Sequence, residues 1–200
     1  MWTIDWAGLI SSLAVAYVLG SVPFAYILSR RAGVDILSAG NGNPGADNVF
    51  RSVGPAAGAA VFLLDVLKGA AAVLVARKLG VAEGLLPLVS LGAVLGHWSS
   101  MFLKFRGGVG LAVCIGCCVA ISPLAGSAGL GAGLLAVPVT RNSSYAAAFG
   151  FLAFVAVAVL TGAGWFAMIA AAGLGGTVFA RHMLVESGKK RAADVQVAEA

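Results

Sequence analysis

The stretch "PAAGAAVFLLDVLKGAAAVLV", Pro55 to Val75, is an apolar run interrupted by two charged residues, Asp65 and Lys68. A helix needs about 20 mostly apolar residues to cross the hydrocarbon core of a bilayer, and this run has that length. Asp65 and Lys68 are three residues apart, on one face of a helix, and can neutralise each other. Because ionisable residues inside a membrane are costly, the pair either holds a helix bundle together or belongs to a functional site.

The composition of the whole chain is that of a membrane protein. Of its 200 residues, 60% are hydrophobic and 10% are charged, and the mean hydropathy is +0.98, whereas about a quarter of the residues in a soluble domain are charged. We therefore predict an all-α, polytopic membrane protein that forms a single domain over residues 1–200. Seven segments are expected to be transmembrane helices: roughly Ile4–Ser29, Pro55–Val75, Leu85–Phe102, Val109–Ile121, Leu124–Val139, Tyr145–Leu160 and Trp165–Phe179. The fourth and fifth are short, and six helices are the alternative if these two form a re-entrant pair.

The basic residues predict the orientation of these helices. Lys and Arg concentrate in cytoplasmic loops, and an outside N-terminus with a cytoplasmic C-terminus leaves only Arg77 and Lys78 outside. The basic residues of the loops and the tail then lie on the cytoplasmic side: Arg30, Arg31, Arg51, Lys104, Arg106, Arg141, Arg181, Lys189, Lys190 and Arg191. The net charge of +5 is thus explained by topology and by attraction to anionic membrane lipids. Nucleic-acid binding is not indicated, because no basic face is interleaved with aromatic residues.

A glycine-rich run, "LSAGNGNPGADNVFR" from Leu37 to Arg51, follows the first predicted helix. Its glycines have the spacing of a dinucleotide-binding turn, but such a turn needs a preceding strand, and here a membrane helix precedes it. What remains is the general chemistry of anion binding, since glycines allow close approach and successive N–H groups form an anion nest. The side chains of Asn41, Asn43 and Asn48 add donors, and Arg51 adds a planar fork suited to phosphate. An empty glycine-rich turn is the alternative.

A second glycine run, "HWSSMFLKFRGGVG" from His97 to Gly110, is expected on the same cytoplasmic face. It places glycines beside Lys104 and Arg106, and two such loops on one face favour a ligand that carries phosphate. His97 and His182 are candidates for proton carriers or phosphate ligands, with an ordinary hydrogen-bonded role as the alternative for each.

The three cysteines, Cys114, Cys117 and Cys118, fall together inside an apolar segment. They lack a nearby histidine or second cysteine pair that would complete a zinc site, and free cysteine is commonly buried as a small hydrophobic residue. We predict neither a metal site nor a cofactor.

Six segments, taken in order, resemble the bacterial integral-membrane glycerol-3-phosphate acyltransferases that use acyl-phosphate as donor. They are "GSVPFAYILSR" (20–30), "GNGNPGADNVFRSVG" (40–54), "LLDVLKG" (63–69), "GHWSSMFLKFRGGVG" (96–110), "TRNSS" (140–144) and "RH" (181–182). The resemblance implies a seven-helix plasma-membrane protein that acylates the 1-hydroxyl of glycerol-3-phosphate and makes lysophosphatidic acid. Its partners are then glycerol-3-phosphate, acyl-phosphate and membrane lipids.

The resemblance also implies a set of site residues. His182 and Ser144 are the expected catalytic residues. The expected phosphate-binding residues are Gly40, Asn41, Gly42, Asn43, Gly45, Asn48, Arg51, Lys68, His97, Lys104, Arg106, Gly107, Gly108, Gly110 and Arg141. A lysine is implied at the position of Val109, and a further asparagine at the position of Trp98.

Two other functions are compatible with the residues. One is an inactive or re-purposed relative that binds a lipid phosphate, since Val109 removes an expected cation. The other is a small transporter, which would need polar residues along several helices near the bilayer midplane; beyond Asp65 and Lys68 the chain has few.

Overall fold

The computed structural model describes residues 5–198, and the side chains of all of these except Ser144, His182 and residues 184–198. Within this range the chain is helical apart from its connections, with one isolated bridge between Ser100 and Arg106. The elements are α1 (Trp6–Ser21), α2 (Phe24–Arg31), α3 (Ala46–Ser52), α4 (Pro55–Lys78), η1 (Glu83–Leu85), α5 (Leu86–Trp98), η2 (Met101–Leu103), α6 (Leu111–Ile121), α7 (Pro123–Thr140), α8 (Ser143–Leu160) and α9 (Trp165–Ala198). The predicted all-α class is confirmed.

Within the part of the chain that the structure describes, three helical segments are long and apolar enough to cross a membrane: Trp6–Arg31, which joins α1 and α2, Pro55–Lys78 and Pro123–Thr140. Leu111–Ile121, Tyr145–Leu160 and Trp165–Arg181 are shorter apolar helices. Every apolar segment singled out in the sequence thus contains a helix, and α6 and α7 are separate helices that meet at Ser122.

Three helix boundaries differ from the prediction. The first segment is divided at Pro23, because proline cannot donate the backbone hydrogen bond that would continue α1 into α2. The predicted helix Leu85–Phe102 ends at Trp98, where the backbone N–H of Gly108 donates to the carbonyl of His97 at 3.1 Å. The last helix runs past Phe179 to Ala198, since loss of apolar character marks the end of a membrane span but does not end a helix.

Close helix packing depends on glycines that face a neighbouring backbone. A Cβ atom at Gly69 of α4 would run into the carbonyl of Val113 in α6, and one at Gly116 of α6 into the carbonyl of Val66 in α4. The same relation joins α1 and α5, where Gly20 faces the carbonyl of Ala93. These contacts bring the backbones of α4 and α6, and of α1 and α5, to the shortest separation that small residues permit.

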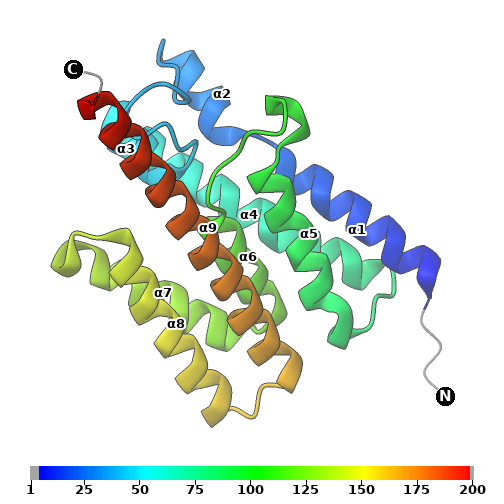
Figure 1. Ribbon diagram of the computed structural model, residues 1–200. Helices are drawn as coiled ribbons and strands as arrows, with labels where there is room; N and C mark the ends of the chain where they lie inside the picture. Colours follow the sequence, from blue (N-terminus) through cyan, green and yellow to red (C-terminus); the bar gives the residue numbers. More distant parts are fainter. Residues whose placement is uncertain (1–4, 199–200) are drawn as a thin grey trace.

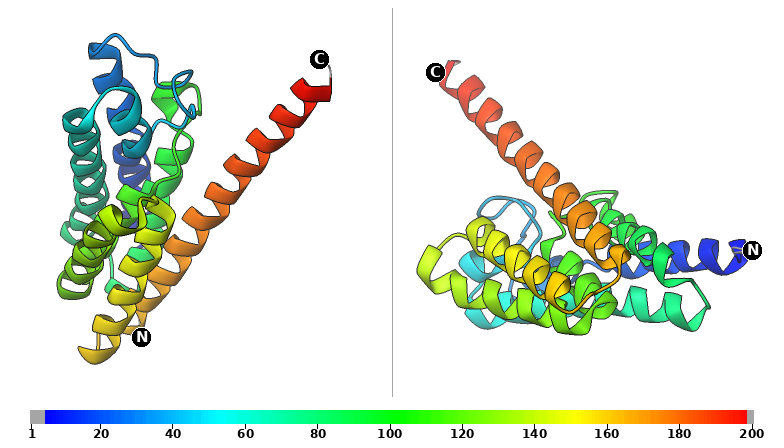
Figure 2. Two further views of the ribbon diagram at one scale, coloured as in Figure 1. Left: turned by 90° about the vertical axis from the view of Figure 1, so that its left-hand side faces the viewer. Right: turned by 90° about the horizontal axis from the view of Figure 1, so that it is seen from below.

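The connections gather at the two ends of the bundle. In Figure 1, α2, α3 and the loop after α5 lie towards the end of the molecule where the C-terminus lies, and the α4–α5 and α8–α9 connections lie towards the other. Figure 2 shows that the last part of α9 projects beyond the other helices. A small apolar cluster of Ala25, Ile36, Val49 and Val61 attaches the first glycine run and α3 to α2 and α4.

The glycine contacts predict a specific sensitivity. Gly116→Ala should lower the stability of the detergent-purified protein by about 1–3 kcal/mol, the usual cost of overpacking, and thermal unfolding should report it. Gly131→Ala in α7 is the matched control, because nothing lies within 4 Å of a Cβ placed there. Equal melting temperatures for the two variants would contradict the backbone contact between α4 and α6.

Candidate functional site

The polar centre of the molecule is a buried cluster of Asp65, Lys68 and His97. The Nζ atom of Lys68 lies 2.7 Å from Oδ1 of Asp65 and 3.0 Å from Nδ1 of His97. The relative exposure of all three residues is 9% or less. Nδ1 of His97 is also 3.9 Å from Oδ1 of Asp65. The pair that the sequence predicted within α4 is therefore present, and α5 adds a histidine that lies far from it in sequence.

The ammonium group of Lys68 is fully used inside the protein. Its third donor goes to the carbonyl of Val22 at 2.8 Å, at the point where Pro23 divides the first helical segment. The ring of Phe24 lies 5.6 Å away, within cation–π range. An ammonium group has three donors and no acceptor, so Nδ1 of His97 accepts from Lys68 and Nε2 of the neutral ring carries the proton.

The first glycine run is shaped by the buried side chain of Asn48. Its Nδ2 atom donates to the carbonyls of Ala39 at 3.0 Å, Asn43 at 3.1 Å and Ile36 at 3.4 Å. Its Oδ1 atom accepts from the backbone N–H of Asn41 and the hydroxyl of Ser52, each at 3.2 Å. The backbone of Gly40 has a φ of 56° and passes directly over this amide. Asn48 is therefore the internal scaffold of the loop.

The second glycine run closes on His97 and on the first run. A Cβ at Gly108 would lie 2.5 Å from Nε2 of His97 and 2.9 Å from the carbonyl of Pro44. A Cβ at Gly107 would likewise collide with the carbonyl oxygens of His97 and Trp98. The two glycine runs, which the sequence predicted on one face, thus meet at the Nε2 side of His97.

Two pockets adjoin this junction. One is lined by His97, Pro44, Gly107 and Gly108 on its polar side, and by the chain from Gly20 to Ala25 with Ser100 and Leu103 on the other. The second is apolar and is lined by Val22, Pro23, Tyr26, Ile27, Phe102 and Leu103. Val22, Pro23 and Leu103 belong to both, so an apolar surface continues directly from the polar junction.

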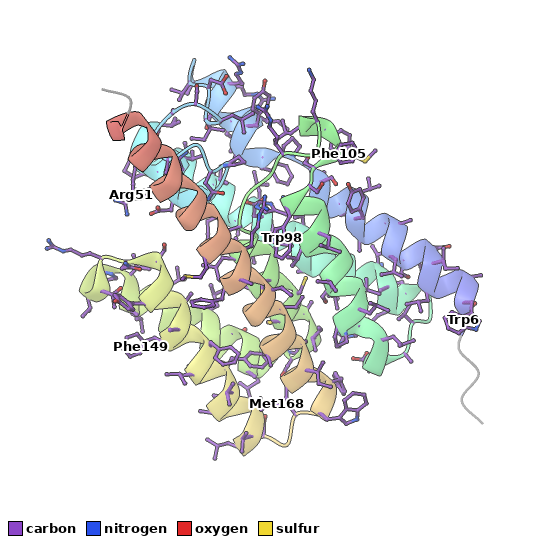
Figure 3. The ribbon with its side chains drawn as sticks, in the orientation of Figure 1. Trp6, Arg51, Trp98, Phe105, Phe149 and Met168 are labelled. Carbon is purple, nitrogen blue, oxygen red and sulfur yellow. The ribbon has the colours of Figure 1, made fainter. Side chains whose placement is uncertain are left out.

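The expected cations of the two runs lie at the surface. Arg51 is exposed on α3 and forms an ion pair with Asp47 at 3.2 Å, one helical turn earlier. Lys104 and Arg106 are exposed and form no ion pair among the described residues. Figure 3 shows Arg51 and Phe105 at the periphery and Trp98 near the middle of the molecule.

Arg141, Ser144 and His182 are placed by other helices. Arg141 is exposed in the turn between α7 and α8, with a φ of 49°. Ser144 is at the start of α8 and His182 is in α9, and their side chains lie outside the described part. The functional role of each predicted site residue remains a prediction.

Trp98 and Arg181 form a contact that the sequence did not predict. The indole Nε1 of Trp98 donates to the carbonyl of Val109 at 2.7 Å, and the guanidinium carbon of Arg181 lies 5.9 Å from the centre of the ring. Nothing in the sequence brings position 98 and position 181 together. The side chain of Val109 packs against the apolar core.

The described residues contain no group of three or more His, Cys, Asp or Glu side chains that could hold a metal ion. Cys114 and Cys117 are buried in α6 and Cys118 is half-buried. Cys117 donates to the carbonyl of Gly69 at 3.4 Å, so it contributes to the packing of α6 against α4.

Fold and site define a class of all-helical integral membrane proteins in which two glycine runs close over a buried Asp–Lys–His cluster. The family model for glycerol-3-phosphate acyltransferase matches residues 10–185. The chain belongs to the glycerol-3-phosphate acyltransferase family.

Known relatives match most of the chain. A glycerol-3-phosphate acyltransferase of Geobacter sulfurreducens is 42% identical over 150 residues, which cover 75% of this chain and 76% of the relative. One of Thermus thermophilus is 39% identical over 151 residues, or 76% of each chain. The crystal structure of PlsY, an integral membrane glycerol 3-phosphate acyltransferase, in its glycerol 3-phosphate form is similar with a TM-score of 0.79 and 29% identity, over 93% of this chain and 92% of that one. Its lysophosphatidic acid form gives a TM-score of 0.77 at 31% identity, over 87% of each chain.

The scaffold role of Asn48 can be tested. Asn48→Ala leaves several buried backbone groups without a partner, at about 1–3 kcal/mol each. We expect faster amide hydrogen exchange in residues 36–45, while exchange in α5 stays unchanged. Asn41→Ala is the control, because the exposed Asn41 side chain accepts only the N–H of Asn43. Equal exchange in the two variants would contradict the scaffold role.

Proposed function

We propose that this chain transfers an acyl group from acyl-phosphate to the 1-hydroxyl of glycerol-3-phosphate and so makes lysophosphatidic acid at the bacterial plasma membrane. The observation that carries the proposal is the junction of the two glycine runs at His97, next to an apolar pocket. Such a junction offers close backbone approach to a phosphate group and an apolar surface beside it. Membership of the family supports the same reaction.

The reaction suits a protein that positions and neutralises its substrates. The hydroxyl oxygen attacks the carbonyl carbon of acyl-phosphate, the bond from that carbon to the phosphate oxygen breaks, and phosphate leaves. Acyl-phosphate is a mixed anhydride and is already activated, so no covalent intermediate with the protein is needed. The main requirements are orientation of two phosphorylated molecules and stabilisation of the developing negative charge. We propose His182 as the acceptor of the hydroxyl proton and Ser144 as a second catalytic residue.

The residues of the buried cluster have different proposed roles. We propose that Lys68 acts as a positioning residue, because its three donors are occupied by Asp65, Val22 and His97. His97 then presents the N–H of Nε2 towards Gly108 and donates to a phosphate oxygen. The main chain can come close to the phosphate at the residues without side chains, Gly107, Gly108 and Gly110. Gly110 begins α6 without a side-chain cap on its first amides, and such amides attract anions.

Further cations and amides are proposed for the rim of the phosphate site: Asn41, Asn43, Arg51, Lys104, Arg106 and Arg141, with Gly40, Gly42 and Gly45 in the first run and Asn48 as its scaffold.

A relative that binds a phosphate without turnover is the second candidate. Val109 favours it, since the side chain at the position where the resemblance implies a lysine is apolar and packs into the core.

We further propose a single domain with seven membrane spans, an outside N-terminus and a cytoplasmic C-terminus. The alternation of connections between the two ends of the bundle supports this topology (Figure 1). Both glycine runs then lie on the cytoplasmic side, where acyl-phosphate and glycerol-3-phosphate are supplied.

The reaction is tested with the detergent-purified protein, palmitoyl phosphate and radiolabelled glycerol-3-phosphate. We expect labelled lysophosphatidic acid and one equivalent of released phosphate. Binding of glycerol-3-phosphate without any product would instead establish the second candidate.

The Arg51–Asp47 pair gives two opposite predictions. Arg51→Ala should weaken glycerol-3-phosphate binding by about 1.5–3 kcal/mol, the value of a hydrogen bond to a charged group, and Arg51→Lys should not fully restore it because the planar fork is lost. Asp47→Ala removes the competing carboxylate and should strengthen binding. Isothermal titration gives both affinities, and a shift of the same sign in both variants would place the phosphate away from Arg51.

The topology is tested by labelling single cysteines from outside the cell, in a background without Cys114, Cys117 and Cys118. A cysteine at Glu83 should react with a membrane-impermeant maleimide, and cysteines at Gly42 and Lys104 should react only after the membrane is opened. Labelling of Gly42 in intact cells would reverse the proposed orientation.

A further inference from the structure

Arg181 in α9 is a cation that lacks an anionic partner among the residues whose side chains the structure describes. Its side chain is half-buried, and its Nε atom is buried without a hydrogen-bond partner. The carboxylates of the described ion pairs are taken by Arg30, Arg51, Lys68 and Arg77. Because a partly buried charge is stable only when it is paired or hydrogen-bonded, a guanidinium whose buried Nε–H has no partner is suited to an anionic ligand.

The position of Arg181 is set by Trp98. The guanidinium carbon lies 5.9 Å from the centre of the indole ring, within the range of a cation–π interaction. Trp98 is also bound to the second glycine run, because Nε1 of the same ring donates to the carbonyl of Val109 at 2.7 Å. A Cβ at Gly110 would lie 3.0 Å from that nitrogen. Trp98 therefore joins α9 to the second glycine run and brings Arg181 to it.

We propose that Arg181 binds a substrate phosphate group at the second glycine run, Gly107–Gly110, and that Trp98 is the positioning residue that holds the guanidinium there. The chemical class of the ligand is a phosphate monoester or acyl-phosphate, and this assignment rests on the proposed function. Arginine presents N–H groups in a fork that matches phosphate oxygens. A cation–π contact uses the face of the ring and leaves these N–H groups available to an oxyanion.

This role of Arg181 accounts for the apolar side chain of Val109 and for the partial burial of Trp98. Val109 needs no charged side chain, since the cation arrives from α9 and the main-chain carbonyl of Val109 serves as the anchor of Trp98. Trp98 is half-buried although it carries a polar N–H, because that N–H has its partner in the loop. Because Arg181 is carried by α9, the proposed site needs both α9 and the second glycine run in their present positions.

The test uses the full chain in detergent and two kinds of measurement. Direct binding of inorganic phosphate and of glycerol-3-phosphate is measured by isothermal titration, and kcat and KM are measured with palmitoyl phosphate as donor. Arg181→Gln should raise the Kd for phosphate about 10- to 100-fold, as for loss of hydrogen bonds to a charged group. Arg181→Lys should recover only part of the affinity. Arg31→Gln, which removes an exposed cation of α2 with no ion pair among the described residues, is the control and should leave the Kd unchanged.

The role of Trp98 is separated from a general structural role by a double variant. Trp98→Leu should raise the Kd about threefold to tenfold, in line with loss of a cation–π contact, and should leave kcat nearly unchanged at saturating substrate. Arg181→Gln combined with Trp98→Leu should bind phosphate no more weakly than Arg181→Gln alone, since Trp98 acts through Arg181. Trp98→Phe keeps an aromatic face and should bind more tightly than Trp98→Leu. Additive losses, or equal losses in Trp98→Leu and Trp98→Phe, would overturn the positioning role.

Each remaining outcome has one meaning. A rise in the KM of glycerol-3-phosphate alone assigns Arg181 to the acceptor phosphate, and a rise in the KM of palmitoyl phosphate alone assigns it to the donor; both support the proposal. Weaker phosphate binding in Arg181→Gln, in a protein whose wild type makes no lysophosphatidic acid, would refute the proposed reaction and keep the phosphate site. Unchanged phosphate binding in a folded Arg181→Gln protein, or no phosphate binding by the wild type, would overturn the site. If Arg181→Gln does not fold, unaltered binding in Arg181→Lys overturns it equally.

Discussion

The buried ammonium group of Lys68 is the constraint on which the rest of the structure depends. A charge at this depth is tolerated only if every donor finds an acceptor. The acceptors come from three places: Asp65 in α4 itself, His97 in α5, and the carbonyl of Val22 at the end of α1. That carbonyl is available because Pro23 interrupts the first helical segment. Lys68 thus ties the end of α1 to the end of α5, close to where the chain enters the second glycine run.

A second polar layer, at the other end of α4, completes the frame. Arg77 forms an ion pair with Glu83 at 2.7 Å and donates to the carbonyl of Ile121 at the end of α6, at 3.2 Å. At the level of Lys68, α4 and α6 meet through Gly69 and Gly116 with their backbones in contact. Lys68 and Arg77 therefore each join elements that are distant in sequence. Since the apolar surfaces of the helices contact lipid as readily as each other, these polar contacts and close backbone approaches specify the arrangement.

The sequence predicted the helical segments well because their signal is local. An apolar run of bilayer length, such as Pro55–Val75, has few alternative structures, and Asp65 and Lys68 were recognisable as a pair from their spacing. The partners of Lys68 were not predictable, because Val22 contributes only a main-chain carbonyl and His97 reaches the pair through tertiary packing. The hydrogen bonds of Asn48 were also not predictable: its sequence neighbours suggested a ligand donor, and the structure shows its side chain bonded to five groups within residues 36–52. The contact of Trp98 with Arg181 depends on where α9 crosses α5, which no local pattern encodes.

The polar residues of the site consequently fall into two groups with opposite requirements. The side chains of Asn48, Lys68 and Trp98 donate to groups of the protein, and in the proposed site we assign them to fixing the shape of the glycine runs. Nε2 of His97 faces Gly108, and the guanidinium carbon of Arg181 lies 5.9 Å from the centre of the Trp98 ring. A chain with 10% charged residues cannot surround a phosphate group with many cations. It can instead keep a small number of donors fixed in a site shielded by apolar helices, where each donor acts in a lower dielectric than water. In the proposed site, Asn48, Lys68 and Trp98 keep those donors fixed. Side chains that do not contact the ligand thus supply the preorganisation that such a site needs.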